Sequence, residues 1–299
     1  MLNVLVNDIL PVFAILAIGF MLGRGRIVSL GEAKTLNRVG FIIFPPPLLI
    51  LLIVGIDLDG AGFRALGIYF LIEVIGIVAI YWIMRQLFDA KPAEAALLGM
   101  CVVFVNSLLF LWPISALIYG DAGAYPIAAI VALDAIVIFG GYIIVLELWT
   151  GKSGALKSVR GLATNPVLVS IFLGLALNLS GLGLSEPLET GFRFVGGATA
   201  PLFLFALGVV LADQQIRLDP VIGVATLAKL ILFPMGVWAG FWLLSPDAAW
   251  RELFVFNAAG PAGMMAFSLA LIYGVRTDRI APVIILTTVL SLISLAFLA

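Results

Sequence analysis

Residues 256–263 read Phe-Asn-Ala-Ala-Gly-Pro-Ala-Gly and interrupt an apolar stretch that runs over residues 251–274. Glycine lets the backbone leave a helix at low cost, and proline frees the carbonyl group four residues earlier. Such freed groups are tolerated in lipid only where protein or a water-filled cavity covers them. The stretch therefore predicts a membrane helix that is broken near its middle, next to Asn257, Gly260 and Pro261.

A second interrupted stretch lies in the first half of the chain. Residues 104–113 read Phe-Val-Asn-Ser-Leu-Leu-Phe-Leu-Trp-Pro, so an asparagine again precedes a proline. Opposed half-helix N-termini would present N–H groups to an anion, and the two asparagine amides would donate to it as well. The alternative is a pair of proline kinks, with each asparagine bonded to a neighbouring helix. The predicted anion site consists of Asn106, Ser107, Pro113, Asn257, Gly260 and Pro261.

The composition of the 299-residue chain places both stretches in a membrane protein. Hydrophobic residues make up 63% and charged residues 11%, against about 45–50% and about 25% in soluble domains. These values exclude a soluble enzyme and a disordered scaffold, and the net charge of -1 excludes a nucleic-acid binder. The chain has no histidine and one cysteine, Cys101. Imidazole catalysis, metal sites built on histidine or cysteine, and an intrachain disulfide are therefore excluded, and we expect no cofactor.

Polar residues divide the chain into ten apolar stretches. A membrane helix needs about 20 apolar residues, so we expect an all-α polytopic membrane protein with ten spans. The predicted spans are 8–23, 36–56, 65–87, 94–119, 124–149, 164–181, 191–212, 219–244, 251–274 and 280–298.

The positive charges predict the orientation of these spans. Positive residues gather on the cytoplasmic side of membrane proteins, and here they gather in the connections after the odd-numbered spans. Both termini should therefore lie outside. The residues concerned are Arg24, Arg26, Lys34, Arg38, Arg85, Lys91, Lys152, Lys157, Arg160, Arg217, Arg276 and Arg279.

An internal repeat divides the chain at its middle. Residues 116–120 read Ala-Leu-Ile-Tyr-Gly and recur at 270–274, and Pro47-Leu48 recurs as Pro201-Leu202 at the same offset. Because each copy holds five spans, an odd number, the second copy enters the membrane from the other side. Inverted repeats of this kind are typical of secondary transporters. We expect residues 1–150 and 151–299 to be the two repeats; the alternative is chance similarity among apolar helices.

Two further features lie inside the predicted spans. The run Pro45-Pro46-Pro47 is expected not to form regular helix, and Pro201 is its counterpart in the second repeat. Pro45, Pro47 and Pro201 are expected either to wall the same cavity or to be structural kinks.

Charges inside a span are costly and suggest function. Glu73, Asp134 and Lys229 are the candidates, as a structural or gating ion pair, as a proton-coupling site or as direct substrate ligands. Glu73 and Lys229 occupy near-equivalent places in the two repeats with opposite charge, so we consider a direct pair between them, or pairing with Asp134. Glu94 and Glu147 lie nearer span ends and are expected to reach lipid headgroups.

Taken together, these residues resemble the auxin efflux carrier family, which includes the plant PIN exporters and bacterial carriers of malonate and similar organic acids. The resemblance covers essentially the whole chain and is most specific in four places. These are residues 106–113, Asn165-Pro166, 201–208 and 257–261. The bile-acid sodium symporter family shares the architecture.

The resemblance implies a scaffold of spans one, two, six and seven that dimerises, and a transport domain of spans three to five and eight to ten. The transport domain would slide as an elevator, with the Asn106 and Asn257 amides holding a substrate carboxylate. We therefore expect a bacterial inner-membrane carrier of a small organic anion, possible partners being a proton or sodium. The alternatives are a sodium-coupled symporter, a channel and a membrane-embedded enzyme.

Overall fold

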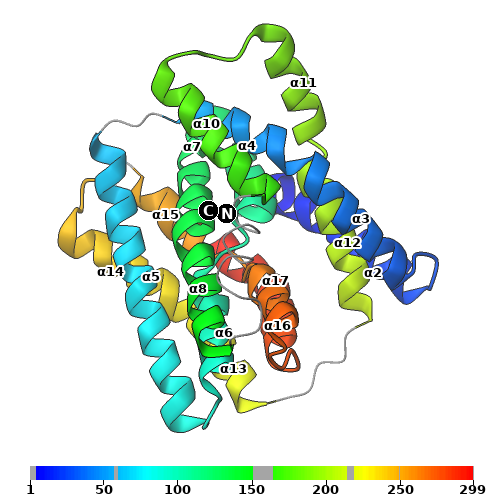
Figure 1. The fold of residues 1–299 in the computed structure, drawn as a ribbon, viewed down its shortest axis with the longest axis vertical. Coiled ribbons are helices and arrows are strands. Elements are labelled where there is room, and N and C mark those ends of the chain that lie inside the picture. The colour runs from blue at the N-terminus through cyan, green and yellow to red at the C-terminus, as the bar shows by residue number, and fades with distance from the viewer. Residues whose placement is uncertain (1–4, 57–59, 151–163, 214–218, 249, 299) are drawn as a thin grey trace. The chain divides into compact units, whose positions relative to one another are not determined.

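The computed structural model describes residues 5–56, 60–150, 164–213, 219–248 and 250–298. In these ranges every element is helical, and η denotes π-helical turns (Figure 1). The first half contains η1 (Leu5–Ile9), α2 (Leu10–Arg24), α3 (Leu30–Ile43), α4 (Pro45–Val54), α5 (Gly60–Leu87), α6 (Pro92–Val103), η2 (Ser107–Leu111), α7 (Trp112–Leu133), η3 (Asp134–Phe139) and α8 (Gly140–Thr150). The second half contains α10 (Pro166–Ser180), α11 (Glu186–Gly196), α12 (Thr199–Ala212), α13 (Pro220–Leu227), η4 (Ala228–Leu232), α14 (Phe233–Leu244), α15 (Arg251–Ala258), α16 (Met265–Tyr273) and α17 (Ile280–Leu298).

Seven helical segments within the described residues are long and apolar enough to cross a membrane. They are Val6–Arg24, Leu30–Val54, Gly62–Leu87, Tyr125–Thr150, Glu186–Ala212, Pro220–Leu244 and Ile280–Leu298. The predicted sixth span contains the 15-residue α10, and the predicted fourth and ninth spans each consist of shorter helices. The structure therefore has the helices of a multi-pass membrane protein, while the count of ten spans stays a prediction.

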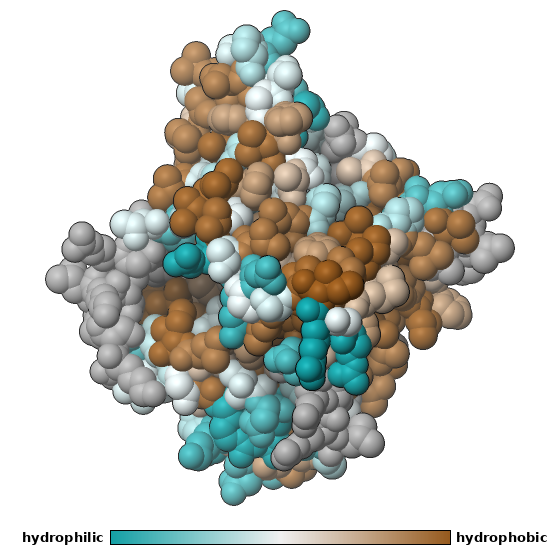
Figure 2. Space-filling model, turned by 90° about the vertical axis from the view of Figure 1, so that its right-hand side faces the viewer, coloured by the Kyte–Doolittle hydropathy of each residue, from teal (hydrophilic) through white to brown (hydrophobic). Residues whose placement is uncertain are grey.

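The surface agrees with a lipid environment. Figure 2 shows a face on which hydrophobic residues cover broad areas. Met21, Ile42, Phe172 and Trp242 are each more than half exposed. Apolar surface on this scale is rare in water-soluble monomers. Lys152, Lys157, Arg160 and Arg217 lie outside the described residues, so the orientation of the termini also stays a prediction.

The chain forms two compact units, each built from segments that are distant in sequence. Unit 1 consists of Met1–Asp57, Leu108–Ala132 and Arg160–Gln215. Unit 2 consists of Leu58–Ser107, Leu133–Val159 and Ile216–Ala299. Unit 1 contains the four spans that the resemblance assigns to a scaffold, and in addition Leu108–Ala132, which we had assigned to the transport domain.

Glycines bring the helices of unit 1 into backbone contact. Helix α2 packs along α12, and α3 also packs on α12 (Figure 1). A Cβ atom on Gly19 would lie 2.1 Å from the carbonyl oxygen of Phe205. A Cβ atom on Gly208 would lie 2.1 Å from the carbonyl oxygen of Leu16. Since no larger side chain fits either place, the two helices lie closer together than side-chain packing would allow.

Other contacts in unit 1 are reciprocal between the two halves of the chain. Gly40 of α3 packs against Leu202 of α12, and Gly196 of α11 packs against Leu48 of α4. Leu48 and Leu202 are the residues that the sequence repeat pairs. Each half therefore contributes one glycine and one leucine to the same kind of contact.

The prolines of unit 1 begin helices, which corrects the expectation that three in succession prevent one. Pro45, Pro46 and Pro47 are the first three residues of α4, and Phe44 alone separates them from the end of α3. The first N–H groups of a helix have no acceptor within it, so proline there loses no hydrogen bond. Pro201 is likewise the third residue of α12.

The repeated pentapeptide ends each time at a glycine with positive φ. Gly120 has φ 76° and bends α7, and Gly274 has φ 66° and follows α16. A residue with a Cβ atom adopts this backbone conformation only at a cost. The conformation therefore explains why both copies end in glycine.

Candidate functional site

The break in the predicted ninth span lies between two helices of unit 2. Helix α15 ends at Ala258 and α16 begins at Met265. Gly260 and Pro261 lie in the non-helical segment between them. The segment therefore has the position that its sequence predicts.

The break in the predicted fourth span lies further upstream than expected. Helix α6 ends at Val103, and Phe104 is extended, with φ -73° and ψ 105°. Pro113 is the second residue of α7, which follows η2 without a gap, so it lies within a helical segment that begins at Ser107. The non-helical break thus precedes Ser107, and Pro113 is not part of it.

The two breaks are joined by backbone hydrogen bonds. The N–H group of Asn106 donates to the carbonyl oxygen of Pro261 at 2.9 Å, and that of Gly263 donates to Phe104 at 2.8 Å. Val105 and Ala262 form an antiparallel bridge. Each segment therefore satisfies polar groups that the other leaves open, which a buried backbone requires. We call residues 104–106 and 260–263 the crossing.

Gly263 is needed at the crossing because of its neighbour. A Cβ atom on Gly263 would lie 2.6 Å from the Phe104 ring and 3.2 Å from the Phe104 carbonyl oxygen. The close approach leaves no room for a side chain.

Asn257 lies directly before the crossing and is fully buried. Its Nδ2 donates to the hydroxyl oxygen of Tyr69 on α5 at 3.0 Å. Its Oδ1 is buried and has no hydrogen-bond partner among the described residues. The amide nitrogen is thus bonded to a neighbouring helix, as the kink alternative predicts. The amide oxygen can still accept a hydrogen bond from a donor.

Asn106 and Ser107 lie at the other side of the crossing. Both are buried, and the Ser107 hydroxyl has no hydrogen-bond partner among the described residues. A buried polar group without a partner costs free energy. The open groups of Ser107 and Asn257 therefore favour a polar ligand.

Two acids are buried in unit 2. Glu73 of α5 and Asp134 of η3 are almost fully buried, and their carboxyl groups lie within hydrogen-bonding reach of each other. No N–H or O–H group in the described residues donates to either. Two such groups satisfy each other best by sharing a proton. We call Glu73 and Asp134 the carboxyl pair.

Lys229 of η4 is the buried cation of unit 2. Its Nζ donates to the carbonyl oxygen of Ala258 at 2.9 Å and lies 4.8 Å from the Phe233 ring centroid. It acts electrostatically on both acids, but no ion pair within 4.0 Å joins it to either acid in the described structure. The short Glu73–Lys229 pair that we considered is therefore not formed.

Glu94 corrects another expectation. It is buried at the start of α6 and does not point to lipid headgroups. Its Oε1 lies 3.1 Å from Arg279 Nη1 and 3.7 Å from Arg276 Nη2. Arg279 also binds Asp219 at 2.7 Å. These ion pairs join the start of α6, the start of α13 and the turn before α17.

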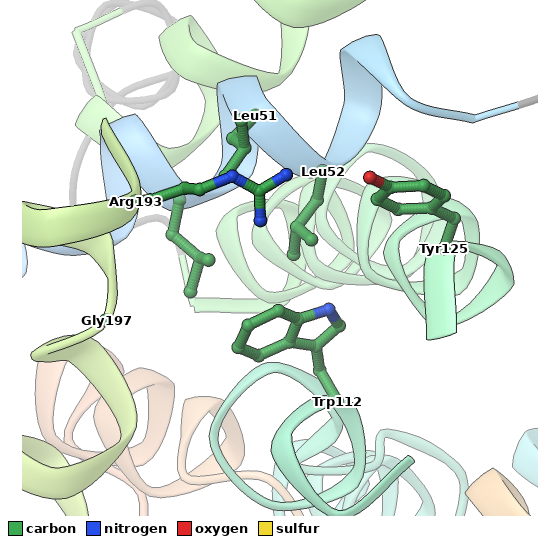
Figure 3. Close-up of a pocket in the computed structure, with 7 residues that line it drawn as sticks. Leu51, Leu52, Trp112, Tyr125, Arg193 and Gly197 are labelled. Atoms are coloured by element: carbon green, nitrogen blue, oxygen red, sulfur yellow. The ribbon is translucent and has the colours of Figure 1, made fainter. Parts of the chain in front are cut away.

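A separate cavity lies in unit 1, with a volume of about 110 Å³. Leucines of α4 form one side, and Figure 3 shows that Arg193, Trp112 and Tyr125 point toward one another from three directions. The Trp112 Nε1 group is buried without a hydrogen-bond partner in the described residues. The lining residues are Leu48, Leu51, Leu52, Trp112, Tyr125, Arg193 and Gly197. Pro45, Pro47 and Pro201 are not among them, so their role as a cavity wall stays a prediction.

Sequence reasoning missed two residues that the structure brings to these sites. Tyr69 looks like an ordinary apolar residue of a span, although it lies one helical turn before Glu73. Arg193 was not among the candidate site residues. The described residues contain no group of three His, Cys, Asp or Glu side chains that could hold a metal ion, and Cys101 is a buried free thiol.

Comparison with known proteins gives the family. The sequence model of a family described as "Membrane transport protein" matches residues 4–299. The chain is 26% identical over 297 residues to the "Putative malonate transporter" of Rhizobium meliloti, covering 95% of this chain and 91% of that protein. It is 25% identical over 302 residues to an "Uncharacterized transporter" of Methanothermobacter thermautotrophicus, covering 97% and 95%. It is 26% identical over 250 residues to "Uncharacterized transporter YfdV" of Escherichia coli K12, covering 79% and 78%. The chain therefore belongs to this family of membrane transport proteins, the auxin efflux carrier family, and is a membrane transporter and not an enzyme.

Proposed function

We propose that the chain is a secondary transporter of a small organic anion, which binds beside the crossing in unit 2. The hydrogen bonds between Asn106 and Pro261 and between Gly263 and Phe104 carry the proposal. They hold two broken helices together at the place where Asn106, Ser107 and Asn257 have polar side chains. Broken helices at matching places in two repeats are typical of transporter sites.

The chemistry of these side chains favours a carboxylate. An asparagine amide and a serine hydroxyl can donate hydrogen bonds and carry no charge of their own. Since Nδ2 of Asn257 donates to Tyr69 in the structure, Asn257 would donate to an anion with its amide turned over, which exchanges nitrogen and oxygen and keeps the shape of the side chain. A small mono- or dicarboxylate would accept several such bonds at once. The name of the Rhizobium meliloti relative supports malonate as the first compound to test.

Reciprocal contacts support the proposal that the two halves are inverted repeats. The contact between Gly40 and Leu202 has its counterpart between Gly196 and Leu48. Gly120 and Gly274, which end the two copies of the pentapeptide, both have positive φ. Two such halves, with a scaffold and a transport domain, suit the elevator motion that the family resemblance implies.

The buried charges support coupling to a proton. The carboxyl pair has no donor of its own, and the only buried cation near it is Lys229 among the described residues. Two ionised acids and one ammonium group carry one net negative charge, which one added proton would neutralise. A sodium-coupled symporter is the runner-up, since sodium would supply the same charge. Sodium-dependent uptake, or thermal stabilisation by sodium but not potassium, would favour that alternative.

We further propose that the protein lies in the inner membrane with both termini outside and dimerises through the scaffold spans. The distribution of Lys and Arg in the sequence supports the orientation. Cysteine labelling near each terminus in intact cells tests the orientation, and cross-linking in the membrane tests the dimer.

Counterflow in liposomes tests the transport function. Purified protein is reconstituted into liposomes loaded with unlabelled malonate, and labelled malonate is added outside. A carrier should accumulate the label transiently, whereas a channel should only equilibrate it. If neither malonate nor a panel of other small carboxylates gives counterflow, organic-anion transport is the wrong function.

A further inference from the structure

The cavity in unit 1 has three polar groups on an otherwise apolar wall. In Figure 3 the guanidinium group of Arg193, the indole nitrogen of Trp112 and the hydroxyl group of Tyr125 face the same space from three directions. Leucines of α4 and Gly197 form the rest of the described lining, which contains no acidic side chain. Arginine and tryptophan side chains donate hydrogen bonds and accept none. The cavity therefore suits a ligand that accepts hydrogen bonds.

Trp112 supplies a buried donor that no described residue satisfies. Its Nε1 atom is buried and has no hydrogen-bond partner within the ranges that the structure describes. The nitrogen of a buried tryptophan usually has such a partner, and a buried donor without one costs free energy. An oxygen atom of a ligand in the cavity would accept from this group and remove the cost.

The bend at Gly120 lets two parts of α7 reach the cavity. Tyr125 follows Trp112 by 13 residues, so the two would lie about 20 Å apart along a straight helix. Gly120 lies between them with φ 76° and ψ 165°, which no helix contains. The Tyr125 ring then lies over Gly55 at the end of α4, where a Cβ atom would be 2.7 Å from the ring. Two glycines thus place the Tyr125 hydroxyl at the cavity.

Arg193 of α11 supplies the positive charge. Glu189, one turn earlier, accepts hydrogen bonds from its Nε and Nη2 atoms at 3.1 and 2.9 Å. Both side chains of this pair are nearly half exposed. Ion pairs of that exposure are weak, so an anion in the cavity can compete with Glu189 for the guanidinium group.

The size of the cavity and the directions of its donors favour a phosphate group. Its volume is about 110 Å³. Since a cavity of about 150 Å³ holds benzene, this one takes a group of roughly five heavy atoms. A phosphate group has that size and presents oxygen atoms in several directions, whereas both oxygens of a carboxylate lie at one edge. Arginine also forms strong hydrogen bonds with phosphate.

The position of Arg193 along its span makes a phospholipid the nearest source of phosphate. The segment Glu186–Ala212 has 27 residues, so it is about 40 Å long and matches a bilayer with its headgroups. Arg193 lies about 10 Å along the helix from its first residue, and a long arginine side chain reaches toward headgroups. Leu188 and Phe194 of the same helix are 52% and 85% exposed, as expected beside lipid tails.

We propose that the cavity in unit 1 binds a phosphate group, which Arg193, Trp112 and Tyr125 hold by hydrogen bonds. The phosphate comes from a phospholipid headgroup or from free phosphate in solution. Bound there, it joins α7 to α11 and stabilises unit 1. The inference goes beyond the proposed transport function and does not depend on it, because the residues at the crossing are not involved.

The first test observes the Trp112 donor directly. Protein labelled with ¹⁵N-tryptophan in a maltoside detergent, which has no phosphate, shows six indole N–H signals. Trp112→Phe identifies one of them, and Trp242→Phe, at a position 59% exposed, is the control. Dihexanoyl phosphatidylglycerol or inorganic phosphate should move the Trp112 signal downfield, because its N–H group gains an acceptor. Dihexanoylglycerol, which lacks phosphate, should leave it in place.

The second test measures the affinity for the phosphate compound that moves the signal. Arg193→Gln should weaken binding by about tenfold or more, because hydrogen bonds between charged groups are strong. Arg276→Gln is the control, since Arg276 also pairs with an exposed acid, Asp278 at 3.1 Å, and does not line the cavity. If Arg193→Gln does not fold, Tyr125→Phe replaces it. That variant keeps the ring over Gly55, loses only the hydroxyl group and should bind several-fold more weakly.

The outcomes identify the source of the phosphate or overturn the inference. A shift with phosphatidylglycerol alone supports a lipid site, a shift with inorganic phosphate alone supports a site for free phosphate, and a shift with both supports recognition of the phosphate group itself. An unmoved Trp112 signal with both compounds overturns the inference. So does an equal shift with dihexanoylglycerol, a shift with malonate but not with phosphate, or wild-type affinity in the Arg193 or Tyr125 variant. Malonate counterflow tests the transport function separately.

Discussion

The ammonium group of Lys229 donates a 2.9 Å hydrogen bond to the carbonyl oxygen of Ala258, the last residue of α15. The final carbonyl groups of a helix have no donor within it, and together they form the negative end of its dipole. The buried cation thus stabilises the end of a half-helix at the crossing.

Lys229→Met should therefore destabilise the protein. The variant keeps most of the side-chain volume but leaves the Ala258 carbonyl group without its donor, which should cost about 1–3 kcal/mol. Thermal unfolding in detergent measures the change, with Lys34→Met at an exposed position as the control. Equal melting temperatures for the two variants would show that the contact contributes nothing.

Asn106→Ala and Asn257→Ala should each weaken carboxylate binding by about tenfold or more, because a hydrogen bond to a charged group is worth about 1.5–3 kcal/mol. Asn178→Ala is the matched control. The Asn178 amide binds the carbonyl groups of Ile53, Val54 and Ile56 at 3.0, 3.0 and 2.8 Å and so supports the end of α4. That variant should lose stability and keep its affinity. Wild-type affinity in both of the other variants would remove them from the site.

The double variant Glu73→Gln, Asp134→Asn should abolish uptake that is driven by a pH gradient, because neither amide can take up a proton at neutral pH. Counterflow, which needs no gradient, should remain. Uptake by the double variant at the wild-type rate would exclude the carboxyl pair as the coupling site.

Gly208→Ala should destabilise unit 1. Its Cβ atom would lie 2.1 Å from the carbonyl oxygen of Leu16, and overpacking of this kind costs about 1–3 kcal/mol. Gly223 of α13 has nothing within 4 Å of such an atom, so Gly223→Ala should be neutral or slightly stabilising, through helix propensity. Thermal unfolding of both variants checks the prediction, which fails if their melting temperatures are the same.

Asp219, just outside the span Pro220–Leu244, should stabilise the protein in a pH-dependent manner. Partial burial would raise the pKa of Asp219, but hydrogen bonds from the Val221 N–H group and Arg279 lower it below its ordinary value. A lowered folded-state pKa stabilises above the unfolded-state pKa, and the effect is lost as the pH falls through the folded-state pKa.

Asp219→Asn retains a helix-capping side chain but removes the charge. The variant should be less stable than wild type at neutral pH, by less than about 1 kcal/mol, and the difference should vanish in acid. Unfolding at several pH values measures it, with the exposed Asp247→Asn as the control. A difference that persists below the folded-state pKa would point to a cause other than charge.

The sequence predicted the second break better than the first. Gly260 and Pro261 indicate an unwound segment, because glycine and proline change the conformational preference of the backbone at their own positions. Phe104 and Val105 carry no such signal, and they are extended because they pair with the other break. Such pairing is a tertiary effect that no local pattern contains.

The buried acids were predicted from their cost in a membrane, but their partners were not. Glu73 and Lys229 occupy matching places in the repeat, which suggested a direct pair. In the structure, Lys229 instead donates to the Ala258 carbonyl group, and Glu73 lies beside Asp134. Tyr69 escaped notice because a tyrosine within a span is common, and its importance depends on Asn257, which is distant in sequence.

The interleaving of the two units has a consequence for biogenesis. Gly19 of α2 finds its partner Phe205 of α12 only after about two thirds of the chain has been synthesised. Contacts between such distant residues form slowly, since the intervening chain must be ordered first. The early helices therefore lack their packing partners until α12 has been synthesised. Residues 1–150 made alone should be degraded, because these partners never follow. The two halves made as separate chains in the same cell should still assemble, because each half contains the helices against which the other half packs.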